Sequence, residues 1–313
     1  MFSIVIPTWN NLEYLKLCID SIRRHSMYDH EILIHVNEGS DGTLEWVKKS
    51  GLKFTYSERN LGVCLSTNII SALASRDWLL YLNDDMICCP GWDAALVTAA
   101  ESKKTDLALF FSRLIEPMDT GNPLVLVDNF GQKPEEFDEG RMLERYDKNK
   151  KADMWGMGSQ PTLVRRKWWH AVGGYSIEFS PGMSSDDDLL MKFWVLGCRD
   201  YHLIDASRVY HFACRSTGRV RRNRGGRAFV MKWGITQASF KKDYLRKWNG
   251  ENAGLQSFPA GGTKSKLKRL AYSMSGYPLD DLRLWDASPG KGLTTEDGTP
   301  HFARTDVPDQ NDP

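Results

Sequence analysis

The alternation of two kinds of segment over residues 2–82 constrains the fold more than any other feature of the sequence. Short apolar runs, β-branched in residues 2–6, predict strands at residues 2–6, 31–36, 53–56 and 78–82. Between them, apolar side chains at helical spacing predict helices, at residues 12–24, 43–49 and 66–74. Strands separated by helices of this length imply right-handed crossovers. We therefore expect an α/β fold with a mostly parallel sheet flanked by helices.

The second half of the chain is less regular. A helix is predicted over residues 187–196 and strands at 201–204 and 208–211, which indicates a mixed sheet. Six arginines then fall within residues 215–227, a helical stretch follows at 229–248, and the remainder is rich in Gly, Pro and Ser. We expect two halves of one α/β domain, then a basic loop with a helix, then an extended arm or tail, at residues 1–100, 101–214, 215–250 and 251–313.

The composition indicates a folded chain without a global charge bias. Hydrophobic residues make up 41% and charged residues 26% of the chain, and the net charge is +1. This balance excludes a chain-wide attraction to nucleic acid or anionic lipid, so either partner would need a local patch. The six cysteines form no CxxC pair, and no run approaches the ~18 apolar residues of a membrane span. We expect a cytoplasmic protein with reduced thiols and no transmembrane segment, for which only peripheral membrane contact remains open.

Polar loops follow three of the predicted strands, at residues 7–10, 37–42 and 83–86. In a parallel sheet of this kind the ligand crevice lies beyond the carboxyl ends of the strands, so the three loops should meet at one rim. The strongest local signal is Asn83-Asp84-Asp85, two carboxylates at the end of a buried strand. One or two carboxylates are what a divalent cation on a diphosphate usually takes from a protein, although Asn-Asp-Asp is also ordinary turn composition.

The order and spacing of several motifs resemble the family 2 glycosyltransferases of the GT-A fold. The resemblance covers about residues 2–215 and rests in the first half on Ser3–Asn10, Asn37–Thr43, Asn60–Gly62 with Asn68, Leu82–Asp85 and Pro90–Trp92. It implies a GT-A type fold, a mostly parallel Rossmann-like sheet flanked by helices, here with a C-terminal helical extension. It also implies transfer of a sugar from a nucleoside diphosphate, UDP by default, to the hydroxyl group of a glycan or another acceptor.

The resemblance also implies roles for individual residues of the nucleotide-sugar half. Glu38 falls on the position that contacts the base or ribose, Asp84 lies near the ribose, and Asp85 would ligate Mn²⁺ or Mg²⁺. The remaining donor-binding positions are Pro7, Thr8, Asn10, Asn60 and Asn68. The family loop usually has an acidic pair where this chain has Asn37-Glu38 and one residue fewer, which leaves the nucleobase open. Turn formation or helix capping is the alternative role for Glu38 and Asp41.

The acceptor half resembles the same family in four blocks, Trp155–Gly158, Leu163–Arg166, Val172–Tyr175 and Ser185–Leu190. Asp186 falls on the catalytic base, and a shift of one residue would give that role to Asp187. A carboxylate that takes the proton of an acceptor hydroxyl fits this assignment, and one base without a covalent nucleophile means a single displacement with inversion. Aspartates at a helix N-terminus are also stabilising without any catalytic meaning. Trp155 and Gly156 are candidates for contact with the acceptor or diphosphate.

His211 and the arginines that follow it have competing interpretations. The family frequently places a histidine here that reaches the metal or diphosphate, whereas an isolated His on a strand is more often a core residue. Arg215 and Arg219 belong to the 215–227 cluster, which could close over the diphosphate, contact nucleic acid or another polyanion, or be a solvated face.

Two other classes of function compete with sugar transfer. A nucleotidyltransferase of related fold would need a Gly-rich phosphate loop after the first strand, which residues 7–10 do not provide. A non-catalytic protein that binds glycan or nucleic acid on the same scaffold remains an alternative, as does a transferase acting on a modified nucleobase in DNA.

Overall fold

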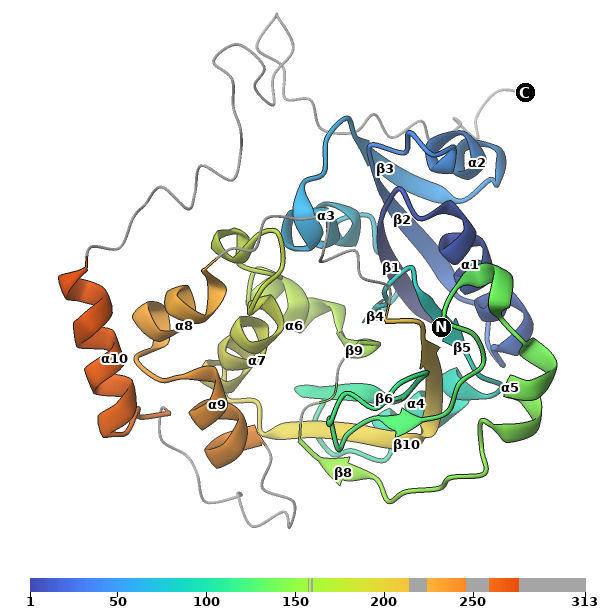
Figure 1. Ribbon diagram of the computed structural model, residues 1–313. Coiled ribbons are helices and arrows are strands. Elements are labelled where there is room, and N and C mark those ends of the chain that lie inside the picture. The colour runs from blue at the N-terminus through green and yellow to red at the C-terminus, as the bar shows by residue number, and fades with distance from the viewer. Residues whose placement is uncertain (157, 159, 214–223, 246–258, 276–313) are drawn as a thin grey trace, which may run out of the picture.

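The computed structural model describes residues 1–156, 158, 160–213, 224–245 and 259–275, and Figure 1 shows its arrangement. The first half has the predicted alternation of strands and helices. Its strands are β1 (Phe2–Trp9), β2 (Glu31–Asn37), β3 (Lys53–Ser57), β4 (Trp78–Tyr81) and β5 (Met86–Cys88). Its helices are α1 (Leu12–His25), α2 (Thr43–Lys49), α3 (Gly62–Ser71) and α4 (Trp92–Glu101).

The second half adds more strands to the same sheet and most of the remaining helices. The strands are β6 (Ala108–Glu116), β7 (Leu126–Val127), β8 (Met154–Trp155), β9 (Thr162–Arg165) and β10 (Asp200–His211). The helices are α5 (Glu139–Arg145), α6 (Arg166–Ala171), α7 (Ser185–Val195), α8 (Gly225–Trp233), α9 (Gln237–Phe240) and α10 (Thr263–Met274). Two 3₁₀ turns lie at Pro134–Glu136 and Ile177–Phe179, and a π-helical turn, Lys241–Leu245, continues α9.

The strands of the described residues form one ten-stranded mixed sheet. Its main path runs β3-β2-β1-β4-β9-β6-β10-β5, with β7 beside β6 and β8 beside β10. The four strands from β3 to β4 are parallel, as the crossover argument predicts, while β9 is antiparallel to both of its neighbours. The carboxyl ends of β1, β2 and β4 therefore share one edge of the sheet.

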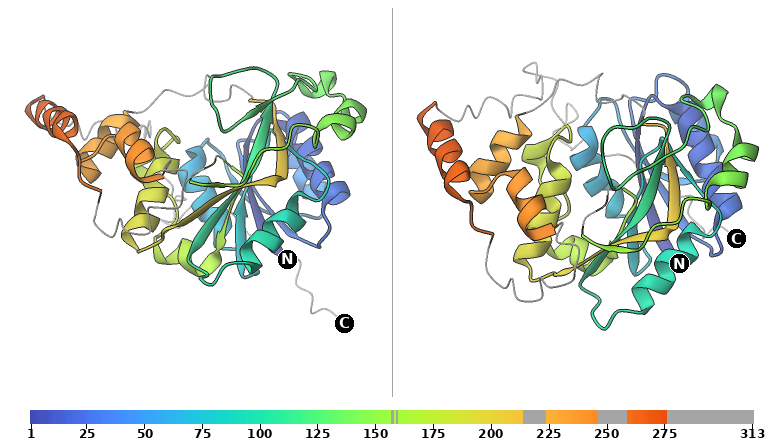
Figure 2. Two further views of the ribbon diagram at one scale, coloured as in Figure 1. Left: turned by 90° about the horizontal axis from the view of Figure 1, so that it is seen from below. Right: turned by 60° about the horizontal axis from the view of Figure 1, so that its bottom comes forward.

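Helices cover both faces of the sheet because its inner strands are apolar on both sides. On β1, Val5 faces a core shared with α3, α6 and α7, whereas Ile4 and Ile6 face a core shared with α1 and α4. Figure 2 shows these two helical layers on opposite sides of the sheet. Within the described residues, no helix combines the length and the apolar character that crossing a bilayer requires.

A buried ion cluster shapes β10, which is one strand where the sequence predicts two short ones. The register of β10 on β6 shifts between Ile204 and Arg208, and Asp205 lies in that irregularity. Asp205 accepts hydrogen bonds from Arg113 at 3.0 Å and from Arg208 at 2.7 Å. Because both cations satisfy the buried carboxylate, the strand continues past the irregularity and carries His211 to the sheet edge.

The C-terminal region differs from the expectation in two places. The predicted helical stretch 229–248 is broken, because Gly234 takes a left-handed conformation that ends α8, and residues 246–248 lie outside the described part. Residues 263–274, which the sequence analysis assigns to an extended arm, form α10 instead. Arg227 of α8 donates a hydrogen bond of 2.9 Å to the Tyr272 carbonyl oxygen, which joins the two helices.

Candidate active site

A cavity of about 430 Å³ lies at the shared carboxyl edge of β1, β2 and β4, a volume within the usual range for small-molecule sites. Its floor comes from the loops after these strands, and the start of α7 and the end of β10 form its walls. The lining residues that the argument uses are Thr8, Asn11, Asn60, Asp84, Asp85, Gln160, Pro181, Asp186 and His211. Asp85 and Asp186, which are distant in sequence, thus face one space.

The end of β1 fixes the first carboxylate, Asp84. The Thr8 hydroxyl donates to Asp84 Oδ2 at 2.6 Å, and the Asn11 amide donates to the same oxygen at 3.2 Å. Asp84 is buried, so these donors replace part of the hydration that the carboxylate has lost. The side chain is therefore held in one orientation at the cavity floor.

The second carboxylate, Asp85, lies beside His211 at the end of β10. Pairing of β10 with β5 brings the two residues together, and the Phe212 amide donates to the Asp85 carbonyl oxygen at 3.1 Å. His211 Nε2 is 3.5 Å from Asp85 Oδ2, and His211 Nδ1 is 2.9 Å from Glu116 Oε1. Burial alone would lower the pKa of His211, but the two carboxylates outweigh burial and raise this pKa to about 10.

Asp85 and His211 suit a divalent cation that takes its other ligands from a diphosphate. No group of three or more His, Cys, Asp or Glu side chains able to hold a metal exists among the described residues. A complete protein cage is therefore excluded for that part of the chain, but diphosphate-bound Mg²⁺ or Mn²⁺ needs only one or two protein ligands. Glu116 at Nδ1 leaves Nε2 facing Asp85, which is the carboxylate–histidine arrangement common around metals. The residues present thus fit the cation.

The three aspartates at the start of α7 have different surroundings. Asp186 is exposed and lines the cavity, whereas Asp187 and Asp188 are buried and face the C-terminal helices. Asp187 pairs with Lys241 at 2.9 Å and accepts a hydrogen bond from Gln237. Burial raises the pKa of Asp187 despite the neighbouring ammonium group. Of the two candidates for the base, the structure brings only Asp186 into the cavity.

Asp186 is oriented by two donors that both approach the same oxygen. Gln160 Nε2 donates to Asp186 Oδ1 at 2.7 Å, and the Tyr175 hydroxyl donates to it at 2.8 Å. Burial raises the pKa of Tyr175 well above its ordinary value, so this phenol remains a donor at neutral pH. No described residue hydrogen-bonds Oδ2, which is therefore the oxygen able to accept a proton.

The loop after β2 contacts the loop after β1 beside the cavity. Asn10 donates to Glu38 Oε2 at 2.9 Å, and both residues have positive φ angles, 48° and 59°. Neither side chain is part of the cavity lining, although Trp9 and Asn11 are. Asp41 accepts from the Leu12 amide at 2.9 Å and from the Thr43 amide at 3.0 Å, so it serves the turn and the start of α2.

Several other predicted site residues lie elsewhere or serve the scaffold. Asn60 lines the cavity and accepts from the Gly62 amide, and Pro7 also lines it. Asn68 instead exchanges two hydrogen bonds with the Tyr175 backbone, at 2.7 and 2.8 Å, which ties α3 to the acceptor half. Arg215 and Arg219 fall outside the described residues.

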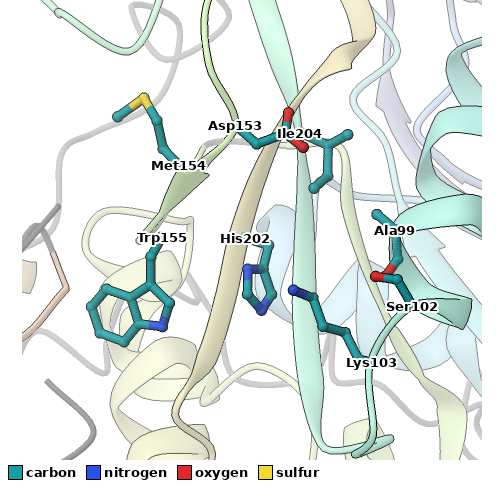
Figure 3. Close-up of a pocket in the computed structure, with 8 residues that line it drawn as sticks. All are labelled: Ala99, Ser102, Lys103, Asp153, Met154, Trp155, His202 and Ile204. Atoms are coloured by element: carbon teal, nitrogen blue, oxygen red, sulfur yellow. The ribbon is translucent and has the colours of Figure 1, made fainter. Parts of the chain in front are cut away.

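Trp155 lines a second, separate cavity of about 210 Å³ together with Lys103, His202 and five further residues (Figure 3). Its indole NH donates to the Arg199 carbonyl oxygen at 2.9 Å, and the Gly156 amide donates to the Tyr201 carbonyl oxygen. Neither residue lines the larger cavity. The predicted contact of Trp155 and Gly156 with an acceptor therefore does not involve the space between Asp85 and Asp186.

The sequence analysis missed four side chains that hold or line the cavity: Asn11, Glu116, Gln160 and Tyr175. Glu116 is a carboxylate at the end of the apolar strand β6, a signal that resembles the Asp84-Asp85 pattern. Gln160 and Tyr175 reach Asp186 only through the folding of residues 101–214; no local pattern marks Gln160, and Tyr175 is marked only as the last residue of the Val172–Tyr175 block.

Comparison with known proteins identifies the family and the fold of the chain. The family model for glycosyl transferase family 2 matches residues 3–173. Over 90 residues the chain is 33% identical to the PGL/p-HBAD biosynthesis glycosyltransferases of Mycobacterium bovis and Mycobacterium tuberculosis. That match spans 27% of this chain and only 35% of each relative.

Solved structures share the fold at low sequence identity. S. aureus TarS 1-349 in complex with UDP-GlcNAc matches with a TM-score of 0.55 and 12% identity, over 86% of this chain and 78% of that one. GalNAc-T7 with UDP, GalNAc and Mn²⁺ matches with a TM-score of 0.54 and 17% identity, over 89% and 58%. Both are GT-A glycosyltransferases, and the likeness concerns the fold. With more than half of its length matched by the family model, the chain belongs to glycosyltransferase family 2.

Proposed function

We propose that this protein is a metal-dependent, inverting glycosyltransferase that moves a sugar from a nucleoside diphosphate to an acceptor hydroxyl. The observation that carries the proposal is that Asp85 and Asp186 line the same cavity. A candidate diphosphate site and a candidate base could therefore contact the same bound substrate. Membership of glycosyltransferase family 2 supports the reaction class. The UDP and UDP-GlcNAc complexes of TarS and the UDP complex of GalNAc-T7 support UDP as the donor nucleotide.

Asp186 is the general base of the proposed reaction. Its Oδ1 is held by Gln160 and Tyr175, so Oδ2 is the atom that removes the proton from the acceptor hydroxyl. The oxygen of that hydroxyl then forms the new bond to the anomeric carbon while the bond to the diphosphate breaks. Because no enzyme nucleophile intervenes, the reaction is a single displacement and the anomeric configuration inverts.

The donor half binds the nucleotide and the leaving group. Asp84, which accepts hydrogen bonds from Thr8 and Asn11, accepts further hydrogen bonds from the ribose hydroxyls in this proposal. Asp85 and His211 would hold Mn²⁺ or Mg²⁺ on the diphosphate, where the cation supplies positive charge to the leaving group. Glu116 orients His211 for this task.

Donor binding tests the proposal without knowledge of the acceptor. We expect UDP-sugars, more than GDP- or dTDP-sugars, to raise the melting temperature of the full chain by a few degrees when Mn²⁺ is present. When the UDP-sugar concentration is a hundred times its Kd, binding stabilises the folded protein by about 2.7 kcal/mol, which accounts for this shift. Asp85→Ala should abolish the Mn²⁺-dependent part of the shift. An equal shift in Asp85→Ala and the parent would contradict the cation assignment.

The base is tested by the slow release of UDP from the donor, since water can replace the acceptor. Asp186→Asn should keep the donor-induced shift but lower the release rate by about a hundredfold or more, the usual contribution of a general base. Asp187→Asn is the comparison, because that carboxylate is turned toward Lys241 and should leave most of the rate intact. If the protein binds DNA tightly but neither binds nor hydrolyses any nucleotide sugar, the proposal is wrong and the chain is a binding protein with this fold.

A further inference from the structure

Helix α10 lies at the outer edge of the molecule, on the far side of α8 from the sheet (Figures 1 and 2). One side of α10 contacts the protein, because Ser265 is buried and accepts a hydrogen bond of 3.2 Å from the Thr236 amide. Tyr272 lies on the same side, with the Arg227 guanidinium 5.1 Å from the centre of its ring. The orientation of α10 about its own axis is thereby fixed.

The opposite side of α10 carries a stripe of exposed apolar side chains. Leu267 is 62% exposed, Leu270 57% and Met274 79%. At roughly 100° per residue, these three positions fall within one sector of the helix, and Ser265 and Tyr272 point away from it. No described residue covers the stripe. Isolated exposed leucines are common on proteins, whereas an aligned set on one helix marks a contact surface.

The charged side chains of α10 itself are all positive. Lys266 borders the stripe on one side and Lys264 on the other, at the spacing from which long side chains can extend past an apolar surface, and Lys268 is exposed farther round the helix. Helix α10 contains no Asp or Glu, nor does α8 beneath it. None of the three lysines forms an ion pair with another described residue, so their charge is available to an anionic partner.

We propose that α10 binds the surface of an anionic lipid bilayer, with Leu267, Leu270 and Met274 inserted among the lipids and Lys264, Lys266 and Lys268 on the headgroups. An apolar stripe bordered by cations is the pattern of helices that lie in a membrane interface. A nucleic acid would use the cations but gains little from three exposed aliphatic side chains, which favours the lipid. This inference is independent of sugar transfer, because α10 does not line the cavity.

Sedimentation of the full chain with vesicles tests the proposal. Vesicles of phosphatidylcholine with about one third phosphatidylglycerol should bind the protein at low ionic strength, whereas pure phosphatidylcholine should bind it much more weakly. Replacing Leu267, Leu270 and Met274 together by Ser should weaken binding at least about tenfold, because the apolar contribution is lost. The three side chains are mostly exposed, so circular dichroism and the melting temperature should be unchanged.

Exposed apolar residues elsewhere supply the matched control. Ile177→Ser with Val195→Ser removes side chains that are 55% and 53% exposed on other elements and should leave vesicle binding intact. Failure of the parent chain to bind phosphatidylglycerol vesicles would overturn the proposal, as would binding that survives the triple substitution. Binding to a DNA duplex that requires the lysines but not the stripe would assign α10 to nucleic acid. If light scattering shows a dimer that dissociates on the triple substitution, α10 is a self-association surface.

Discussion

Three consecutive aspartates on α7 have the same chemistry and three different environments. Successive helical positions point about 100° apart, so one carboxylate can face the cavity while its neighbours face the protein. Asp188 accepts hydrogen bonds from Ser176 and Trp233 and pairs with Lys232, and Asp187 pairs with Lys241. Only Asp186 keeps an oxygen directed at solvent. The different environments of the three aspartates thus follow from helix geometry and burial, and not from the residue type.

The hydrogen bonds that Tyr175 and Gln160 donate to Asp186 predict an effect on the rate of UDP release and not on binding of the sugar donor. Tyr175→Phe removes one hydrogen bond to a charged group but keeps the ring, which packs edge-on against Tyr81 and Trp169. We expect kcat for UDP release to fall about tenfold, because Oδ2 is no longer held toward the substrate, while KM for the donor changes little.

Gln160→Ala should have a similar effect, and the double variant should lose more than either single one. Tyr28→Phe, which removes an exposed hydroxyl group elsewhere, is the control and should keep the parent rate. An increase in donor KM with unchanged kcat would show that Tyr175 supports the nucleotide site instead of the base.

Strands β1, β2 and β3 are joined at their starts by one carboxylate, Glu31. Burial opposes its ionisation, but hydrogen bonds from the Ser3 hydroxyl, the Ser75 amide and the Lys53 ammonium outweigh burial. They lower the pKa of Glu31 from its ordinary value of 4.5 to about 2. Ionised Glu31 therefore stabilises the folded chain above pH 4.5, and this contribution is lost as the pH falls from about 4.5 toward 2.

Glu31→Gln should make this dependence visible in denaturant unfolding. The variant should have a lower free energy of unfolding than the parent at pH 6, and the difference should shrink at pH 3, where Glu31 of the unfolded parent is protonated while that of the folded parent is still mostly ionised. Glu45→Gln on α2 removes a carboxylate from an exposed ion pair with Lys48 and should produce a small difference at both pH values. A difference for Glu31→Gln that stays constant with pH would contradict the shifted pKa.

Local periodicity explains which elements could be predicted from the sequence. Helix 43–49 and strand 31–36 were predicted within one residue, because their apolar side chains repeat at short range. Helix α3 begins four residues earlier than predicted, at Gly62, which has a positive φ of 71° and lies close to Pro181. Helix α10 was missed because the Gly- and Pro-rich composition of residues 251–313 outweighed the spacing of Leu267, Leu270 and Met274.

The same distinction applies to the candidate site. Asp84 and Asp85 follow directly from a strand end, and Asp186 was assigned by its match to a family motif, so the sequence was enough to propose all three. Glu116 meets His211 across 95 residues and Gln160 meets Asp186 across 26, through pairings that depend on the whole fold. Asn68 was predicted to bind the donor, and in the structure its amide donates a hydrogen bond to the Tyr175 carbonyl oxygen. The part of this site that the sequence did not predict therefore consists of contacts between residues far apart in the sequence.

At the scale of the molecule, residues 1–100 and residues 101–214 meet along α3. The Val63 amide donates to the Pro181 carbonyl oxygen at 3.0 Å, and Gly62 and Pro181 both line the cavity. A Cβ atom on Gly62 would lie 2.7 Å from Pro181 Cα, and one on Gly174 would lie 2.3 Å from Asn68 Oδ1. The two halves approach at these points more closely than any side chain allows. The separation of these two parts of the chain therefore depends on glycine at both positions.

Gly62→Ala should separate the two halves enough to affect both stability and binding. Gly51→Ala is the matched control, because Gly51 has a similar φ of 70° but nothing within 4 Å of an added Cβ. We expect Gly51→Ala to cost about 1 kcal/mol from the left-handed backbone, and Gly62→Ala to cost about 1–3 kcal/mol more from the clash with Pro181. The melting temperature measures this difference, and UDP-sugar titration with Mn²⁺ should show weaker binding in Gly62→Ala alone. Equal effects of the two substitutions would mean that the backbone conformation matters and the contact with Pro181 does not.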